Sequence, residues 1–170
     1  REATLWVEQG SDLEKEVVDG FVRQVESLPE VQDRVTTFHE AARYAERGSM
    51  MEILAVEGFV SNAERLPDVK DRVAAFRKAA NCSERGSALN QQATSGVFRY
   101  TERLPDVKDR VAAFREVAIW AARDSALQQR AVANMIKTAE KLAEAQDRII
   151  VFREATLWVE QGSDLEKEVV

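Results

Sequence analysis

Residues 66–87 read LPDVKDRVAAFRKAANCSERGS, and residues 104–125 repeat most of these letters as LPDVKDRVAAFREVAIWAARDS. Related stretches begin at Leu28 and Leu142, so one unit recurs every 38 residues. Residues 1–18, REATLWVEQGSDLEKEVV, are identical to residues 153–170, and this offset of 152 residues is four times 38. A fixed period of this length is typical of repeat proteins, in which each small unit packs against its neighbours.

Each 38-residue unit has the hydrophobic pattern of two helices. In residues 30–47, apolar side chains recur at spacings of three and four, which places them on one face of a helix. Thr37, Ala41 and Tyr44 form a second stripe beside the first, so this helix must contact more than one neighbour. The members of the first stripe are Val31, Val35, Phe38, Ala42 and Ala45.

A similar stripe, from Leu13 to Val25, marks the other helix of the unit at residues 12–27. Through the chain the pattern predicts helices at 12–27, 30–47, 50–65, 68–85, 88–103, 106–123, 126–141 and 144–161.

Glycine, serine and proline mark the expected corners. We expect the glycines to end the second helix of a unit in the left-handed conformation, and the corner at Asp124, which replaces one of them, to be slightly strained or differently turned. The serines that follow should cap the next helix, and the prolines should stand just inside a helix start. These residues are Gly48, Gly86 and Gly162; Ser11, Ser49, Ser87, Ser125 and Ser163; and Pro29, Pro67 and Pro105.

Corners of two or three residues make successive helices antiparallel. The sequence therefore predicts an all-α fold, a right-handed α-solenoid of stacked antiparallel helical hairpins with four 38-residue repeats and a partial one. We expect a single domain over residues 1–170. Its repeat units span 11–48, 49–86, 87–124 and 125–162, and residues 163–170 restart the array.

The Gly-containing corner and the Pro corner resemble those of the helical-hairpin class that includes tetratricopeptide repeats. The period of 38 differs from the usual 34 of that family, and its Trp/Leu/Gly/Tyr spacing is absent. In period and tandem style alone, the chain is also similar to the giant microtubule-associated repeat proteins of trypanosomatids, a resemblance that implies a cytoskeletal setting.

An arginine in each unit falls inside the apolar arc, where a charge needs a partner. A glutamate near the end of the preceding helix recurs in every unit, so we expect a structural ladder of Arg–Glu pairs, with a ligand-binding arginine row as the alternative. The ladder residues are Arg34, Arg72, Arg110, Arg148, Glu26, Glu64, Glu102 and Glu140.

Gly20, Gly58 and Gly96 lie in mid-helix, where glycine costs about 1 kcal/mol relative to alanine. We expect a close approach of another helix to compensate for this cost, with a backbone groove for a ligand as the alternative.

The composition argues against catalysis. His39 is the single histidine and is expected on a solvated surface, and Cys82, the single cysteine, has no histidine to activate it. One histidine and one cysteine do not make a metal site, and no phosphate-binding glycine loop occurs. We therefore expect no enzyme, no catalytic residues, no cofactor and no metal.

A net charge of −6 disfavours nucleic acid and anionic lipid as partners. No stretch reaches the roughly 18 apolar residues of a membrane span, and no secretory signal is recognisable, so a cytoplasmic location is expected.

The duplicated 18-residue segment indicates a stack that continues from one copy to the next. We expect a non-enzymatic structural repeat protein that forms an extended scaffold or filament by end-to-end association with itself, through Trp6, Val7, Trp158, Val169 and Val170. Two alternatives stay open. One is an adaptor that binds another protein or a peptide, with residues 90–95 as its best patch. The other is a designed repeat protein without native function.

Overall fold

The computed structural model describes residues 12–46, 48–123 and 125–158, and the described part of the chain is entirely helical. The chain divides into two compact units, residues 1–93 and 94–170, and each is described by itself below. The fold is therefore all-α, as the periodicity predicted, while the single domain and the right-handed superhelix stay predictions.

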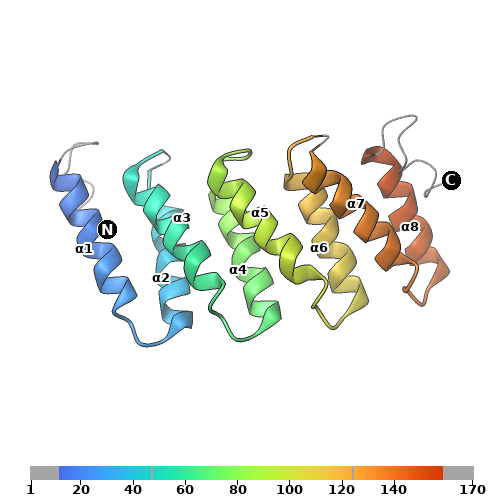
Figure 1. The fold of residues 1–170 in the computed structure, drawn as a ribbon, viewed down its shortest axis with the longest axis horizontal. Coiled ribbons are helices and arrows are strands. Elements are labelled where there is room, and N and C mark those ends of the chain that lie inside the picture. Colours follow the sequence, from blue (N-terminus) through green and yellow to red (C-terminus); the bar gives the residue numbers. More distant parts are fainter. Residues whose placement is uncertain (1–11, 47, 124, 159–170) are drawn as a thin grey trace. The chain divides into compact units, whose positions relative to one another are not determined.

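Among the described residues, the first unit holds four helices and the start of a fifth. These are α1 (Asp12–Glu26), α2 (Val31–Tyr44), α3 (Met50–Ala63), α4 (Val69–Cys82) and the first turns of α5 (Ala88–Thr101). Consecutive helices run antiparallel, and α2 packs along the length of α3 as one hairpin (Figure 1). Each of α1 and α2 also contacts the helix after next, α3 and α4 respectively, so the helices pack in consecutive order as expected for a repeat stack.

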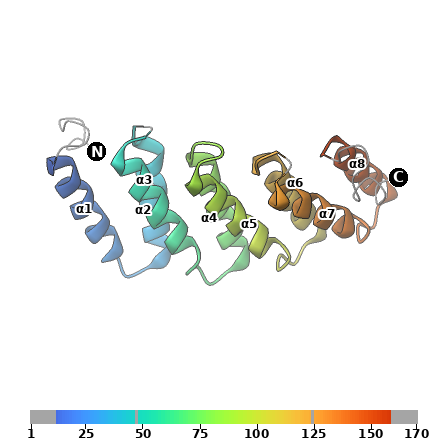
Figure 2. The ribbon, with the colours of Figure 1, turned by 45° about the horizontal axis from the view of Figure 1, so that its top comes forward.

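The second unit repeats this arrangement with the end of α5 and the later helices. These are α6 (Val107–Trp120), α7 (Ala126–Ala139), α8 (Ala145–Ala155) and the short 3-10 helix η2 (Thr156–Trp158). The pair α6 and α7 forms the extensive hairpin of this unit, and α8 packs on α7 after a tight corner (Figure 2).

Serine caps begin α3, α5 and α7, as predicted. The hydroxyl oxygens of Ser49, Ser87 and Ser125 accept hydrogen bonds from the main-chain N–H three residues on, at 3.1–3.2 Å. In two of these corners the residue at that third position also holds the turn, because Asn90 and Gln128 donate their side-chain amides to the carbonyls of Ala80 and Ala118, each at 2.9 Å. Ser11 and Ser163 lie outside the described residues.

The expected position of the prolines was wrong by two residues. Pro67 and Pro105 precede the N-cap residues Asp68 and Asp106, and the helices begin one residue later still. The carboxylate of Asp68 accepts from the N–H groups of Lys70 and Asp71, and that of Asp106 accepts from Asp109 at 3.0 Å. An aspartate can make this cap and a proline cannot, so the aspartate sets the helix start.

The glycines do not end the helices, contrary to prediction. Helices α2, α4 and α6 stop three residues earlier than expected, at extended C-cap residues whose N–H groups bond back four residues. Gly48 and Gly86 do have positive φ angles, 78° and 83°. Each is the third residue of a turn closed by the following serine N–H, a position that requires positive φ in a type II turn. Gly162 and Asp124 lie outside the described residues.

Candidate interaction surfaces at the two end helices

The second helix of each repeat has two apolar stripes, and both are buried in α4 and α6. We call positions equivalent to Val73, Phe76 and Ala80 the forward stripe, and positions equivalent to Ala75 and Ala79 the backward stripe. In α4 all five side chains are buried, and so are the five equivalent side chains of α6. Fully burying a side chain of Val or Phe size contributes roughly 1.5–3 kcal/mol. These inner helices thus have the neighbours on two sides that the wide apolar arc predicted.

Helix α2 has only its forward stripe buried. Val35, Phe38 and Ala42 are inside, whereas Thr37 and Ala41 of the backward stripe are partly exposed. Tyr44, at the end of the same side, has 53% of its surface exposed.

Helix α8 shows the opposite pattern. Val151 and Ala155 of its backward stripe are buried, and its forward stripe is not covered. Ile149 is 59% exposed, although its counterparts Val73 and Val111 are 2% and 4% exposed. Phe152 is partly exposed, although its counterparts are buried in all three earlier repeats. Helix α8 therefore presents an apolar face that, in the other repeats, another helix covers.

Helix α1 also has an uncovered face. Val17 and Phe21 are partly exposed, whereas the equivalent residues of α3, Ala55 and Phe59, are fully buried. Between this face and the backward stripe of α2 lies a groove with a volume of about 670 Å³. Its lining includes Val17, Gly20, Phe21 and Ala41, with Glu40 as its carboxylate.

The predicted close approach at the mid-helix glycines is confirmed at Gly58 and wrong at Gly20. A Cβ on Gly58 would lie 2.5 Å from the ring of Phe38, so the ring of α2 packs directly on the backbone of α3. Nothing lies within 4 Å of the equivalent position at Gly20. On α3, an aromatic ring packs on the glycine. At the equivalent glycine of α1, in the groove, no ring occupies this position.

The four arginines of the predicted ladder do occupy equivalent positions, but the hydrogen-bond acceptor that they have in common is a main-chain carbonyl. Each arginine donates to the carbonyl of the leucine six residues earlier, which ends the turn between two helices. The distances for Arg34, Arg110 and Arg148 are each 2.5 Å. A charge-assisted bond to a carbonyl satisfies a half-buried guanidinium and holds the corner.

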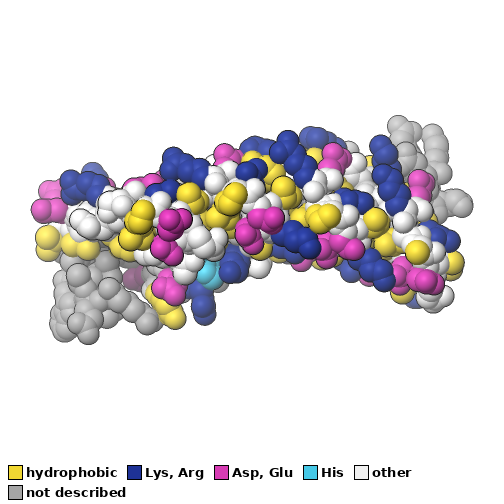
Figure 3. Space-filling view, turned by 90° about the horizontal axis from the view of Figure 1, so that it is seen from below, with side chains coloured by type: hydrophobic (Ala, Val, Ile, Leu, Met, Phe, Trp, Pro, Cys, Tyr) yellow, Lys and Arg dark blue, Asp and Glu magenta, His cyan; other side chains and the backbone are white. Residues whose placement is uncertain are grey.

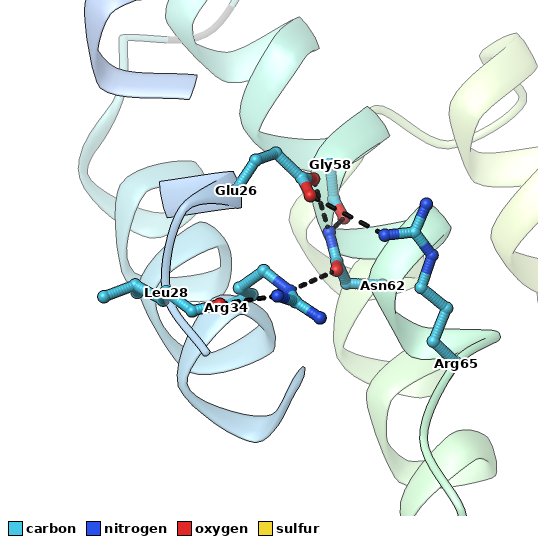
Figure 4. A network of polar contacts seen from close by, with 6 residues as sticks. All are labelled: Glu26, Leu28, Arg34, Gly58, Asn62 and Arg65. Carbon is cyan, nitrogen blue, oxygen red and sulfur yellow. Dashed lines mark hydrogen bonds and ion pairs between the residues drawn. The ribbon is translucent and has the colours of Figure 1, made fainter. Parts of the chain in front are cut away.

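The predicted Arg–Glu pair is wrong at the first position of the ladder. Asn62, which is fully buried, stands between Arg34 and Glu26: it accepts from Arg34 Nε at 3.0 Å and donates to Glu26 Oε1 at 2.8 Å (Figure 4). Glu26 instead forms its ion pair with Arg65, at 3.6 Å and largely exposed to solvent. In the second unit, Arg110 and Arg148 take a second main-chain carbonyl, those of Pro105 and Ala143. Sequence reasoning missed Asn62, although a polar residue inside an apolar stripe was a usable signal.

The single histidine and the single cysteine both lie in partly buried surroundings. His39 is partly exposed and has its ring centroid 5.3 Å from that of Phe59, so it lies at the surface but is only partly solvated. Burial, with Lys78 and Arg43 nearby, lowers the pKa of His39. Burial raises the pKa of the Cys82 thiol, which disfavours the nucleophilic thiolate. Within the described ranges, no three His, Cys, Asp or Glu side chains are grouped so as to hold a metal ion.

Residues 90–95, the patch predicted for an adaptor, are half buried. Asn90, Ala93 and Thr94 are buried, and among these six residues only Gln91 and Gln92 are exposed. Gln92 borders a separate groove of about 720 Å³ in the first unit, lined also by Ile53, Leu89 and Glu57.

Of the predicted end-to-end residues, Trp158 alone is described, and it is partly exposed. Trp6, Val7, Val169 and Val170 lie outside the described residues.

Charged and apolar side chains are intermixed on the face drawn in Figure 3. Large apolar residues exposed on the described surface include Leu13 on α1, Ile149 and Ile150 on α8, and Leu157 in η2. None of the described helices combines the length and apolar character needed to cross a membrane.

Comparison with known proteins adds no family. No protein-family model matches the chain, and a search of curated proteins gives no match.

Proposed function

We propose that the chain is a non-enzymatic structural repeat protein whose copies associate end to end into an extended scaffold. The observation that carries this proposal is the pair of uncovered faces: the forward stripe of α8, and the groove formed by α1 and α2. Inside the chain, a forward stripe packs on the next helix, with Phe38 seated on Gly58. The face of α8 is a forward stripe, like the one that contains Phe38. The face of α1 contains Gly20, which is equivalent to Gly58. The two faces of two copies therefore complement each other head to tail.

Head-to-tail contacts do not close on themselves in a dimer, and repeated addition extends the assembly. The duplicated segment supports the same geometry, because residues 153–170 return to the letters of residues 1–18 after 152 residues. A cytoplasmic, cytoskeletal setting belongs to this proposal through the resemblance in period alone, and co-sedimentation with microtubules tests it.

Static light scattering against protein concentration tests the assembly. The unmodified chain is expected to gain mass with concentration, and Ile149→Lys to weaken association about tenfold or more, because a buried ammonium at the joint has no partner. Ile53→Lys is the matched control, since Ile53 is also exposed, at 43%, but lies on α3 away from both faces. A constant monomer mass over the accessible range would contradict the proposal.

A second candidate function, a peptide-binding adaptor, is favoured by the groove of about 720 Å³ in the first unit. Ile53 and Leu89 give it apolar contacts, and Glu52, Glu57 and Glu84 line it with negative charge, which fits a basic peptide with one apolar anchor. Titration with a labelled Lys/Leu-rich peptide tests this function, and binding unaffected by Glu57→Lys would contradict it.

A further inference from the structure

Two ion pairs in the second unit show how successive repeats are held in register. Lys108 Nζ lies 2.8 Å from Asp147 Oδ2, and Arg115 Nη2 lies 2.6 Å from Glu154 Oε2. Both pairs join α6 to α8, and both partners are 39 residues apart in the sequence. A residue on the second helix of one repeat thus contacts the residue 39 positions later, which lies on the second helix of the next repeat.

The first unit has the same spatial relation with different side chains. His39 of α2 and Lys78 of α4 are 39 residues apart, and they lie near enough for Lys78 to lower the pKa of His39. His39 is equivalent to Arg115, and Lys78 is equivalent to Glu154. The spacing of 39 therefore reports a feature of the repeat packing itself, found in both units.

Arg153 is equivalent to His39, Arg77 and Arg115, and it is exposed on α8. Counting 39 residues on from Arg153 and subtracting the 152-residue period gives position 40. Glu40 is exposed on α2 and lines the groove beside α1. Glu40 has the opposite charge to Arg153. The residue expected to meet Arg153 is therefore a glutamate, just as Glu154 is the glutamate that meets Arg115 within the chain.

The same counting locates the aromatic contact. Phe38 packs on Gly58, 20 residues further on. Twenty residues on from Phe152, less one period of 152, is Gly20, where the seat for a ring is open. One register therefore satisfies both contacts: Phe152 enters the groove at Gly20 while Arg153 reaches Glu40.

We propose that copies of this chain join in one fixed register, in which Arg153 of one copy forms an ion pair with Glu40 of the next while Phe152 packs on Gly20. This inference rests on the proposed end-to-end association and specifies its partner, a second copy of the same chain, and its joint. The register makes the joint a continuation of the internal repeat, with neither a gap nor an inserted residue. Charge pairs of this kind set register and partner choice more than they set affinity.

Charge reversal in the full chain tests the register. Arg153→Glu places a second carboxylate against Glu40, and Glu40→Arg places two guanidinium groups together, so each variant alone is expected to associate about tenfold more weakly or worse. An equimolar mixture of the two variants restores opposite charges at every joint of an alternating stack, and a chain with both substitutions restores them between identical copies. The doubly substituted chain is therefore expected to grow like the unmodified chain in light scattering, and the mixture to grow as an alternating stack that neither variant forms alone.

Lys141→Glu and Glu102→Arg are the matched controls, because they make the same kind of charge change at exposed positions away from the joint. Both are expected to associate normally, and circular dichroism confirms that each variant is folded. Growth of the unmodified chain together with normal growth of Arg153→Glu, or failure of the doubly substituted chain to recover, overturns the register and leaves the proposed association standing. An unmodified chain that stays monomeric overturns both.

Discussion

At the scale of single residues, the two glycines at equivalent positions of α1 and α3 have opposite surroundings. Gly58 touches the Phe38 ring, whereas Gly20 faces open space. Glycine in mid-helix costs about 1 kcal/mol relative to alanine in both places, but the first glycine is needed for packing and the second has no contact in the described structure.

Gly58→Ala is therefore expected to destabilise the fold by about 1–3 kcal/mol, because its methyl group would force the Phe38 ring off the helix. Gly20→Ala is expected to stabilise it by up to about 1 kcal/mol. Urea unfolding at a concentration where the chain is monomeric measures both. Equal effects at the two positions would contradict the packing difference.

His39 gives the residue-scale prediction for pH. Its pKa in the fold is lowered from 6.5, first by burial against Phe59 and then by Lys78 and Arg43. The unfolded chain thus takes up a proton before the folded chain does. The contribution of neutral His39 is complete above the unfolded pKa and is lost as pH falls through the lowered folded value.

The free energy of unfolding is accordingly expected to fall as pH drops below 6.5, the ordinary pKa of a histidine, and before most carboxylates titrate. In His39→Gln the glutamine does not titrate, so this part of the pH dependence should disappear. Urea denaturation at several pH values is the measurement. If the free energy of unfolding of the variant depends on pH in the same way as that of the unmodified chain, His39 is not responsible for this pH dependence.

At the scale of helices, the capping residues differ between repeats in a way that stability measurements can detect. Asp68 caps α4 through its carboxylate, whereas Glu30 at the same place before α2 makes no side-chain cap. Asp68→Ala is expected to cost about 1 kcal/mol, and Glu30→Asp to stabilise α2 by roughly 0.5–1 kcal/mol. Asp68→Asn, which keeps an accepting oxygen, is the control and should stay close to the unmodified chain in thermal unfolding. If Glu30→Asp gives no gain, the shorter side chain is not reaching the N–H groups.

The sequence predicted the helices well and their corners less well. The starts of the helices α1 to α8 fall within one residue of the predicted positions, because the serines and the apolar spacing mark them locally. The ends of α2, α4 and α6 were predicted three residues too late, since Gly48 and Gly86 are turn residues whose role depends on an extended residue before them. The presence of a glycine in the sequence does not show which position of the turn it occupies.

The interior contacts were predictable only in part, for a related reason. Periodicity identified Arg34 and its equivalents as half-buried, but their partner is a leucine carbonyl at the corner, and a main-chain acceptor leaves no sign in the sequence. Asn62 joins Arg34 to Glu26 only because α1, α2 and α3 meet at that point. The two uncovered faces likewise depend on how deeply equivalent positions are buried in the folded chain, which the sequence alone does not determine.

At the scale of the whole molecule, the helices that begin each repeat change charge along the chain. Counting the charged side chains of each helix gives −3 for α1, −2 for α3, +1 for α5 and +2 for α7. In a head-to-tail joint, α1 of one copy is the next member of this series after α7 of the preceding copy, so an acidic helix follows a basic one at every joint. Such exposed pairs are screened by salt, and association should weaken as ionic strength rises.

The register of the joint makes a prediction about the two identical segments. If copies continue one another after 152 residues, residues 153–162 of one copy have the same place in the repeat as residues 1–10 of the next, and residues 163–170 have the same place as residues 11–18. Two identical segments cannot occupy the same position in the stack, so residues 153–170 of one copy and residues 1–18 of the next compete for that position at each joint.

A chain limited to residues 11–162 holds one full period and keeps Ser11, the serine expected to cap α1. We expect this chain to associate more strongly than the full chain in light scattering, by several-fold, because no segment must be displaced before α8 meets α1. Restoring either residues 1–10 or residues 163–170 alone should weaken association to an intermediate level. Loss of association in the 11–162 chain, with its helical content intact, would mean that the duplicated segments form the joint themselves and that α8 and α1 do not meet directly.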